Sequence, residues 1–302
     1  MIKKAIRFLR LIQDLSVRLD NIQQAIGRLE NRQLLPFQTS APVDFEFKVY
    51  SQSGEDGIIQ HLISNVRVPN NCFIEFGVEN YLESNTRFLA LNNYWSGLII
   101  DGDQKNIEFI KKDPIYWRCN IKADSSFITK DNINDIFKRN GIVGDIGLLS
   151  VDIDGNDFWV WKAINSINPA IIVAEYNSFF GSERRVTVPY DPNFVRSNAH
   201  FSKIYYGASI AALVGLANER GYKLVASNKS GNNIFFVKTE LMGNLKELSI
   251  KEAYRPINFR ESHDENGGLT FLTFEESKLL IGDLNVYDID RAEEVQIKTL
   301  SE

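Results

Sequence analysis

The chain has 302 residues, of which 44% are hydrophobic, 24% charged and 12% aromatic, and its net charge is −5. This length predicts one large domain or a domain with appendages, and the composition excludes a wholly disordered or collagen-like chain. The negative charge argues against bulk nucleic-acid binding, and the two cysteines, Cys72 and Cys119, are too few for a disulfide framework or a four-thiolate zinc site. With no signal-peptide pattern and no run of about 18 apolar residues, we expect a cytoplasmic protein.

Residues 1–34 are predicted to form one amphipathic helix. The segment holds seven basic residues against three acidic ones, and its apolar residues are spaced alternately by three and four positions. This spacing favours a coiled coil that makes the protein a homo-oligomer. Two alternatives stay open: the basic start could lie on an anionic membrane, at the inner membrane face, or the helix could pack on its own domain. The seam consists of Ala5, Phe8, Ile12, Leu15, Leu19, Ile22, Ile26 and Leu29.

The rest of the chain divides into a linker over 35–47, which contains two prolines, a main domain over 48–240 and a C-terminal extension over 241–302. In the main domain, continuous apolar runs alternate with helical patterns. Such runs predict a parallel sheet covered by helices on both faces, which is a doubly wound, Rossmann-like α/β fold. The predicted strands cover 72–76, 97–101, 147–152 and 170–175, with a helix over 210–220 and a terminal hairpin of 222–227 and 233–237.

Four of the predicted strands end in a carboxylate: Glu75, Asp101, Asp152 and Glu175. The carboxyl ends of strands line the ligand crevice of open α/β sheets, and burying an unpaired carboxylate is costly. Capping of the following helices is the structural alternative. Four such residues in series favour a polar ligand or a metal.

Glu75, Gly77 and, 26 residues after Glu75, Asp101 form a strand end, a tight turn and an acidic second strand end. This arrangement suits a ligand with a ribose. Glu79 and Tyr81 stand where a dinucleotide motif would have further glycines, and there is no phosphate-binding loop with Lys-Ser/Thr. Both absences favour a nucleoside without a pyrophosphate, which points to S-adenosyl-L-methionine.

Five short motifs are spread over the main domain: SQSGEDG at 51–57, FIEFGV at 73–78, LSVDIDGND at 149–157, IIVAEYN at 171–177 and GAS at 207–209. Together they resemble the FkbM-type methyltransferases and their bacterial relatives, over residues 50–240. The chain departs from the family pattern in the single glycine of its first motif and in Asp154, where the family carries Glu. The resemblance implies a Rossmann-like S-adenosylmethionine-dependent methyltransferase domain over 48–240.

The resemblance also implies a cofactor site. Glu75 and Gly77 would lie at the amino-acid end of S-adenosylmethionine. Asp101 would bind the ribose, with Gly102 and Asp103 in the adjoining turn. Asp124 would lie near the adenine, and Asp152 beside the sulfonium and the methyl acceptor.

A second group of oxygen-bearing side chains lies on two strand ends that should be neighbours: Asp152, Asp154, Glu175 and Asn177. Hard ions such as Mg²⁺ or Mn²⁺ prefer these ligands and acidify a coordinated hydroxyl. The alternative is an Asx-rich turn that caps the next helix.

Asp152 and His200 are the candidate catalytic residues. His200 lies in the insertion 178–206, where it is a candidate general base, or else an ordinary loop histidine. Aromatic residues in this insertion suit a sugar, a glycan or another small polyhydroxylated acceptor. His263, in the polar C-terminal extension, is given no role.

These observations predict an S-adenosylmethionine-dependent O-methyltransferase that acts on a hydroxyl of a sugar or glycan-type acceptor, assisted by a metal or a general base. A nucleotide-sugar or dinucleotide enzyme on the same sheet is one alternative. The other is a non-catalytic coiled-coil assembly protein whose methyltransferase-like domain binds a ligand without turnover.

Overall fold

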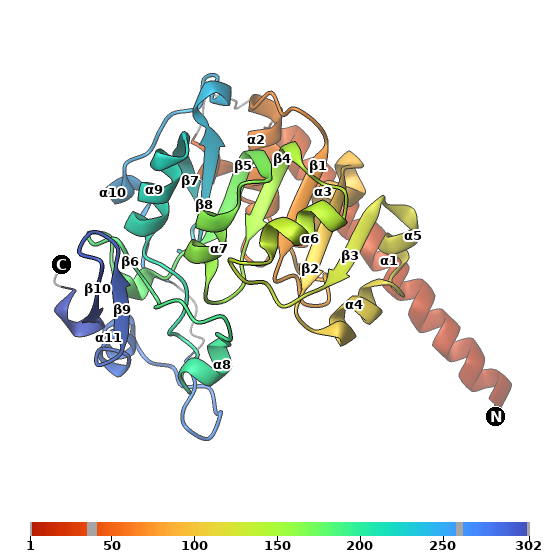
Figure 1. Ribbon diagram of the computed structural model, residues 1–302. Coiled ribbons are helices and arrows are strands. Elements are labelled where there is room, and N and C mark those ends of the chain that lie inside the picture. Colours follow the sequence, from red (N-terminus) through yellow and green to blue (C-terminus); the bar gives the residue numbers. More distant parts are fainter. Residues whose placement is uncertain (1, 35–40, 258–261, 301–302) are drawn as a thin grey trace.

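A computed structural model describes residues 2–34, 41–257 and 262–300. Its centre is a seven-stranded sheet in the order β3-β2-β1-β4-β5-β8-β7 (Figure 1). Strands β1 to β5 pair in parallel, and β8 is antiparallel to both of its neighbours. The doubly wound α/β fold predicted from the sequence is therefore confirmed. The strands are β1 Cys72–Phe76, β2 Ser96–Asp101, β3 Ile121–Ser125, β4 Gly144–Val151, β5 Ile167–Glu175, β7 Tyr222–Ser227 and β8 Asn233–Lys238.

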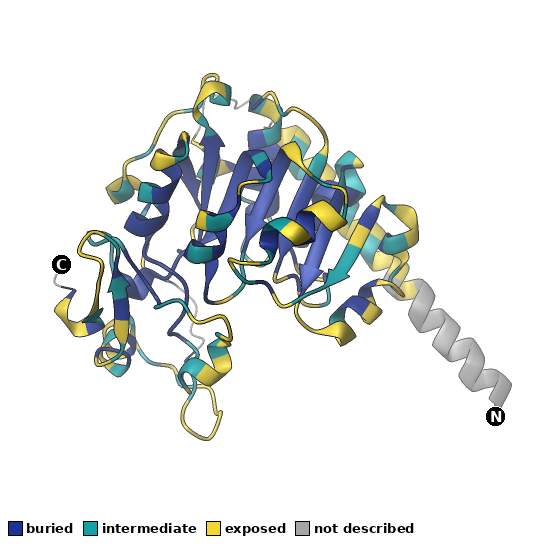
Figure 2. Cartoon of the chain, viewed as in Figure 1, coloured by how far each residue is buried: buried dark blue, intermediate teal, exposed yellow. Residues whose placement is uncertain are grey.

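Helices cover both faces of this sheet, and alternate residues of each strand point to opposite faces. In β1, Phe73 packs against one helical layer, whereas Ile74 and Phe76 pack against the other. The other strands are consequently buried on both sides over most of their length, whereas the edge strand β3 is largely half-buried (Figure 2). The first layer holds α2 Glu55–Asn65, α3 Arg87–Asn93, α4 Gln104–Ile110 and α5 Pro114–Arg118; the second holds α6 Ile133–Arg139, α7 Asp157–Ala163 and α9 Ile210–Glu219.

The N-terminal segment forms one helix, α1 (Ile2–Leu34), which docks on the domain. Asn31 Nδ2 donates to Gln60 Oε1 at 3.2 Å, and Gln23 donates to the Val49 carbonyl. A Cβ at Gly27 would lie 2.4 Å from a Val49 methyl, so glycine permits the close approach. The seam residues from Leu15 to Leu29 are 53–57% exposed, while the side chains of Ala5, Phe8 and Ile12 lie outside the described residues. Pairing of this helix with a second one stays a prediction.

The segment predicted as a linker is packed where the structure describes it. Residues 35–40 lie outside the described residues, but Pro42–Phe45 form a 3₁₀ turn whose Pro42 and Phe45 are buried. The Phe45 ring stacks on the His61 imidazole of α2 with centroids 3.8 Å apart. From residue 42 onward the chain is thus part of the domain's packing.

The C-terminal extension joins the insertion between β5 and α9. A three-stranded sheet in the order β10-β9-β6 combines β6 (Val186–Thr187) from the insertion with β9 (Asn285–Asp288) and β10 (Glu293–Gln296). An ion pair between Arg184 and Asp288 links the same two segments. Two short helices complete this region, α8 Arg196–Ala199 and α11 Phe274–Leu280, while α10 (Ile250–Ala253) packs on the main domain beside α9. Among the described residues, no helix is both long and apolar enough to cross a membrane.

Candidate functional site

A cavity of about 850 Å³ lies where the first four strands of the sheet end. Its lining draws on residues that follow β1 to β4, on the insertion around α8 and on the C-terminal extension. The lining residues are Gly77, Glu79, Ile100, Asp101, Gly102, Asp103, Ser126, Phe127, Ile128, Ile153, Asp154, Asn156, Phe194, Val195, Arg196, Ser197, Lys203, His263 and Leu269. Residues predicted to lie at a ligand, namely Gly77, Asp101, Gly102, Asp103 and Asp154, are among them.

Gly77 allows the ends of β1 and β4 to meet at the cavity. Its φ is +75°, and a Cβ at this position would lie 1.7 Å from the Asp152 carbonyl oxygen. Any side chain would therefore force the two strand ends apart. The Gly77 N–H donates to the Ile100 carbonyl at 3.0 Å, which fixes the turn against β2.

Asp101 ends β2 and holds the neighbouring turns together. Its Oδ2 accepts from the Glu79 N–H (2.8 Å), and its Oδ1 accepts from the Asp103 N–H (2.8 Å) and from Asn106 Nδ2 (3.0 Å). A carboxylate has about four acceptor positions, so one position on Oδ2 is left for a ligand. Asp101 can therefore accept from one ribose hydroxyl rather than two. Asp103 adds an acidic edge and caps α4 by accepting from the Lys105 N–H at 2.8 Å.

The wall beyond β3 is formed by Ser126, Phe127 and Ile128 rather than by the predicted Asp124. Asp124 is in β3 itself and is an ion-pair partner of Arg139, whose Nε lies 3.0 Å from its Oδ2. Asn140 also donates to it at 2.7 Å. These donors occupy the Asp124 carboxylate, so Asp124 holds the end of β3 to α6 and does not line the cavity.

Glu75, predicted to contact the amino-acid end of the cofactor, is a buried anchor for the loop that follows Gly77. Its carboxylate accepts from the Asn85 N–H (2.8 Å), the Thr86 N–H (3.0 Å) and the Thr86 hydroxyl, and it does not line the cavity. Burial raises the pKa of Glu75 to about 7, although these three donors act in the opposite direction. Glu75 thus positions the loop, while Gly77 and Glu79 line the cavity.

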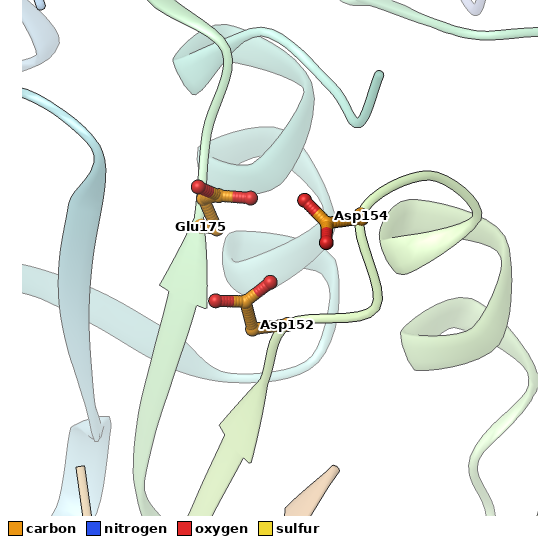
Figure 3. A group of neighbouring side chains, drawn as sticks. All are labelled: Asp152, Asp154 and Glu175. Carbon is orange, nitrogen blue, oxygen red and sulfur yellow. The ribbon is translucent and has the colours of Figure 1, made fainter. Parts of the chain in front are cut away.

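Asp152, Asp154 and Glu175 bring their carboxylates together at the ends of β4 and β5 (Figure 3). One oxygen from each lies within 4.8 Å of the others. Burial is the main cause that raises the pKa of Asp152 and of Glu175 well above the usual carboxyl range, and repulsion between the carboxylates adds to it. No donor in the described part of the chain bonds to the carboxylate of Asp152 or Glu175, whereas Asp154 is an ion-pair partner of Arg196. The group can take up a proton or a cation.

Asn177, predicted as a fourth metal ligand, faces away from this group because the backbone uses its whole amide. Nδ2 donates to the Ile204 carbonyl (3.0 Å) and the Tyr206 carbonyl (2.9 Å), and Oδ1 accepts from the Phe179 N–H (3.0 Å). Asn177 therefore fastens the insertion to the end of β5, and the candidate ligand set is reduced to the three carboxylates.

The loop from Asp152 to α7 is held by Asp157. Its carboxylate accepts from the Ile153 N–H (2.7 Å) and the Gly155 N–H (2.9 Å), which is the Asx-rich turn considered as an alternative from the sequence. Burial raises the pKa of Asp157 to about 6. The turn directs Asp154 toward the cluster, so the capping and ligand roles belong to different aspartates of one motif.

His200 does not line the cavity. Its Nδ1 lies 2.6 Å from the Ser202 hydroxyl, and its ring packs on Phe201 with centroids 4.3 Å apart. His263 lines the cavity instead, although its position in a polar tail gave no indication of this. Asp154 and His263 therefore line the cavity, whereas Asp152 and Glu175 are connected to it through their cluster with Asp154 and do not line it themselves.

The SQSGEDG motif at 51–57 lies outside the cavity and is structural. Asp56 Oδ2 accepts from the Val49, Tyr50 and Ser51 N–H groups at 2.7–2.8 Å. Glu55 Oε1 accepts from Asn228 and Asn233, which tie α2 to the turn between β7 and β8.

No family model matches the sequence, and neither does any curated protein. Solved structures match at low identity. The N-terminal domain of EvdMO1 with SAH bound is 12% identical with a TM-score of 0.41, and the match covers 62% of this chain and 82% of that one. An O-methyltransferase from Bacillus cereus in complex with SAH is 12% identical with a TM-score of 0.40, over 69% and 90% of the two chains. The O-methyltransferase TomG from Streptomyces achromogenes in complex with SAM is 11% identical with a TM-score of 0.39, over 72% and 89%. The fold described above rests on the strand order and register of this chain itself.

Proposed function

We propose that this protein is an S-adenosylmethionine-dependent O-methyltransferase of the FkbM type that methylates a hydroxyl of a sugar or another small polyhydroxylated acceptor. The observation that carries the proposal is the division of the 850 Å³ cavity. One part, from Gly77 to Ile128, has the glycine turn, the acidic strand end and the aromatic wall that a nucleoside requires. The other part is lined by Asp154, which belongs to the cluster of three carboxylates with Asp152 and Glu175, and it has no phosphate-binding loop.

Asp101 and its neighbours would orient the cofactor. The free acceptor position on Asp101 Oδ2 suits one ribose hydroxyl, and the exposed Glu79 and Asp103 carboxylates are candidates for the other. Phe127 and Ile128 offer flat and apolar surface to the adenine. A cationic sulfonium is favoured beside the Asp152 group, because opposite charges attract more strongly where water is partly excluded.

The transfer itself is an in-line displacement, so orientation contributes much of the rate. The acceptor oxygen forms a bond with the methyl carbon, the carbon–sulfur bond breaks, and its electron pair stays on sulfur in neutral S-adenosylhomocysteine. The proton of the hydroxyl must go to a base. Burial raises the pKa of Asp152 and Glu175, which makes either carboxylate a stronger base than an exposed one.

The three carboxylates also fit a hard divalent cation. Their oxygens lie within 4.8 Å of one another, and those of Asp152 and Glu175 have no donor among the described residues. Asp152, Asp154 and Glu175 would hold Mg²⁺ or Mn²⁺. Such an ion, when bound, would acidify the acceptor hydroxyl.

Calorimetric titration of the protein with S-adenosylhomocysteine and, separately, with NAD tests the proposal. We expect binding of S-adenosylhomocysteine alone. Binding of NAD instead would favour a dinucleotide enzyme, and binding of neither would refute the cofactor assignment. Methyl transfer from labelled S-adenosylmethionine to a sugar panel then separates an enzyme from a domain that binds without turnover.

A further inference from the structure

We infer that the cavity wall formed by Arg196, Lys203 and His263 binds an acidic group, a carboxylate or a phosphate, of the methyl acceptor. The inference rests on the proposed function and narrows the acceptor from any polyhydroxylated compound to one with a negative charge. All three residues line the cavity, although they come from the insertion and from the C-terminal extension.

Hydrogen bonds tie the three residues into one surface. The Arg196 Nε donates to the Lys203 carbonyl, and the His263 N–H donates to the Ser202 carbonyl at 3.1 Å. The extension is thereby fixed beside the insertion at the cavity, and two cationic side chains and an imidazole line the same wall.

Arg196 is the fixed member of this surface. Its guanidinium is an ion-pair partner of Asp154 and lies over the Tyr206 ring, 3.9 Å from the centroid. Asp154 thus offsets the Arg196 charge, and the pair joins the basic wall to the carboxylate cluster. The positive charge available to a ligand comes from Lys203.

Lys203 has two features typical of a binding residue. Its backbone is left-handed, with φ at +59°, a conformation that costs a non-glycine residue free energy and occurs often at ligand sites. Its half-buried side chain forms no ion pair with any carboxylate in the described ranges. The His263 imidazole makes no hydrogen bond to the described residues either, and its Nδ1 is buried without a partner.

The distribution of charge across the cavity assigns the ends of the acceptor. Acidic groups lie on the cofactor side, at Glu79, Asp101 and Asp103, and in the carboxylate cluster that would receive the hydroxyl proton. An acidic group on the acceptor would be repelled there and attracted to Lys203. An acceptor with a hydroxyl at one end and a carboxylate or phosphate at the other would place the hydroxyl at the carboxylate cluster and the acidic group at Lys203.

The test measures binding to protein saturated with S-adenosylhomocysteine, with glucose, glucuronate and glucose 6-phosphate as probes. We expect at least one acidic sugar to bind about tenfold more tightly than glucose or better, and Lys203→Met to abolish that preference. Lys251→Met, on the exposed surface of α10, is the matched control and should keep the preference. Glucuronate and glucose 6-phosphate distinguish a carboxylate from a phosphate.

Three results would overturn the inference. The acidic sugars could bind no more tightly than glucose, or the preference could survive in Lys203→Met. Alternatively, Lys203→Met could weaken S-adenosylhomocysteine but not 5′-methylthioadenosine, which would assign the lysine to the carboxylate of the cofactor. Failure of the wild-type protein to bind S-adenosylhomocysteine would instead refute the proposed function, so the two failures are distinguishable.

A different observation carries a second inference: we propose that the exposed seam of α1 binds a second copy of this chain. Leu15, Leu19, Ile22, Ile26 and Leu29 are each 53–57% exposed, while a different face of the helix, with Gly27 and Asn31, docks on the domain. The helix thus packs on its own domain and still presents an unpartnered apolar stripe.

The pattern of the stripe favours a second helix over a membrane. Apart from Val17, the large apolar side chains described as exposed on α1 recur at two positions in seven, the narrow seam of a coiled coil, whereas interfacial helices have a broader apolar face. Within the described side chains of α1, Asp20 and Glu30 accompany the arginines, which weakens attraction to an anionic surface.

Light scattering of the full chain tests this inference. The wild-type protein and the control Val17→Glu/Asn21→Glu, with two exposed residues off the seam, should be oligomeric at micromolar concentration. The seam variant Leu19→Glu/Ile26→Glu should be monomeric with unchanged helix content. A monomeric wild-type protein would overturn the inference, and its co-sedimentation with phosphatidylglycerol vesicles would assign the stripe to a membrane.

Discussion

Replacement of Asp101 by alanine tests the cofactor half of the cavity directly. The Asp101 carboxylate accepts three hydrogen bonds from Glu79, Asp103 and Asn106, which leaves one acceptor position for the ligand. A hydrogen bond to a charged group contributes about 1.5–3 kcal/mol, so Asp101→Ala should weaken S-adenosylhomocysteine by roughly 10- to 150-fold. Loss of two ribose contacts would cost considerably more. Calorimetry measures the change.

The same substitution frees two backbone N–H groups, so loss of binding through misfolding must be separated from loss of the ribose contact. Asp135→Ala, on the exposed side of α6, is the control for a lost surface carboxylate. Far-ultraviolet circular dichroism should be the same for the wild-type protein and both variants, and thermal unfolding should show a modest loss of stability for Asp101→Ala alone. A folded Asp101→Ala protein with unchanged affinity for S-adenosylhomocysteine would refute the ribose assignment.

Three further predictions concern the strand ends. Gly77→Ala should lower the free energy of unfolding by roughly 1–3 kcal/mol and abolish S-adenosylhomocysteine binding, because its Cβ would collide with the Asp152 carbonyl; normal binding would contradict this reasoning. Burial raises the pKa of Asp157 to about 6, above its value in the unfolded chain, so the protonated carboxyl stabilises the fold fully below about pH 4. This contribution, about 3 kcal/mol, is lost as the pH rises through 6. In urea unfolding, the free energy of unfolding should therefore fall less between acidic and neutral pH for Asp157→Asn than for the wild-type protein. EDTA should lower methyl transfer and added magnesium or manganese restore it, whereas full transfer by the stripped protein would exclude an ion at Asp152 and Glu175.

The sheet could be predicted from the sequence because its strands are continuous apolar runs. β1 has the predicted bounds, and β2 begins one residue earlier than predicted. β4 and β5 each begin three residues earlier, where the chain is polar. There Asn168 donates to Asp145 Oδ1 at 2.7 Å, so the pairing of the two strands continues through side chains that apolar periodicity does not detect.

The roles of the acidic residues could not be predicted from their positions, because a role depends on how many donors reach each carboxylate. Glu75 receives three donors from residues ten and eleven positions further along the chain, which makes it an anchor. Asp152 and Glu175 occupy similar strand ends, but no residue in the described part of the structure donates a hydrogen bond to their carboxylates. The sequence shows which carboxylates end strands, whereas only the packing shows which of them remain available for chemistry.

The cavity wall formed by Arg196, Lys203 and His263 could be predicted from the sequence even less than the roles of the carboxylates. His263 lies 60 positions beyond Lys203, in a tail whose sequence has neither the apolar periodicity nor a motif that would place it at the cavity. What places it there is the hydrogen bond from its own N–H to the Ser202 carbonyl. The strand ends that would hold the cofactor belong to the sheet, but the residues that would recognise the acceptor belong to two irregular segments, the insertion and the C-terminal extension. Since such segments vary more readily than the sheet, a change of acceptor requires changes around Lys203 and His263 and leaves Gly77 and Asp101 in place.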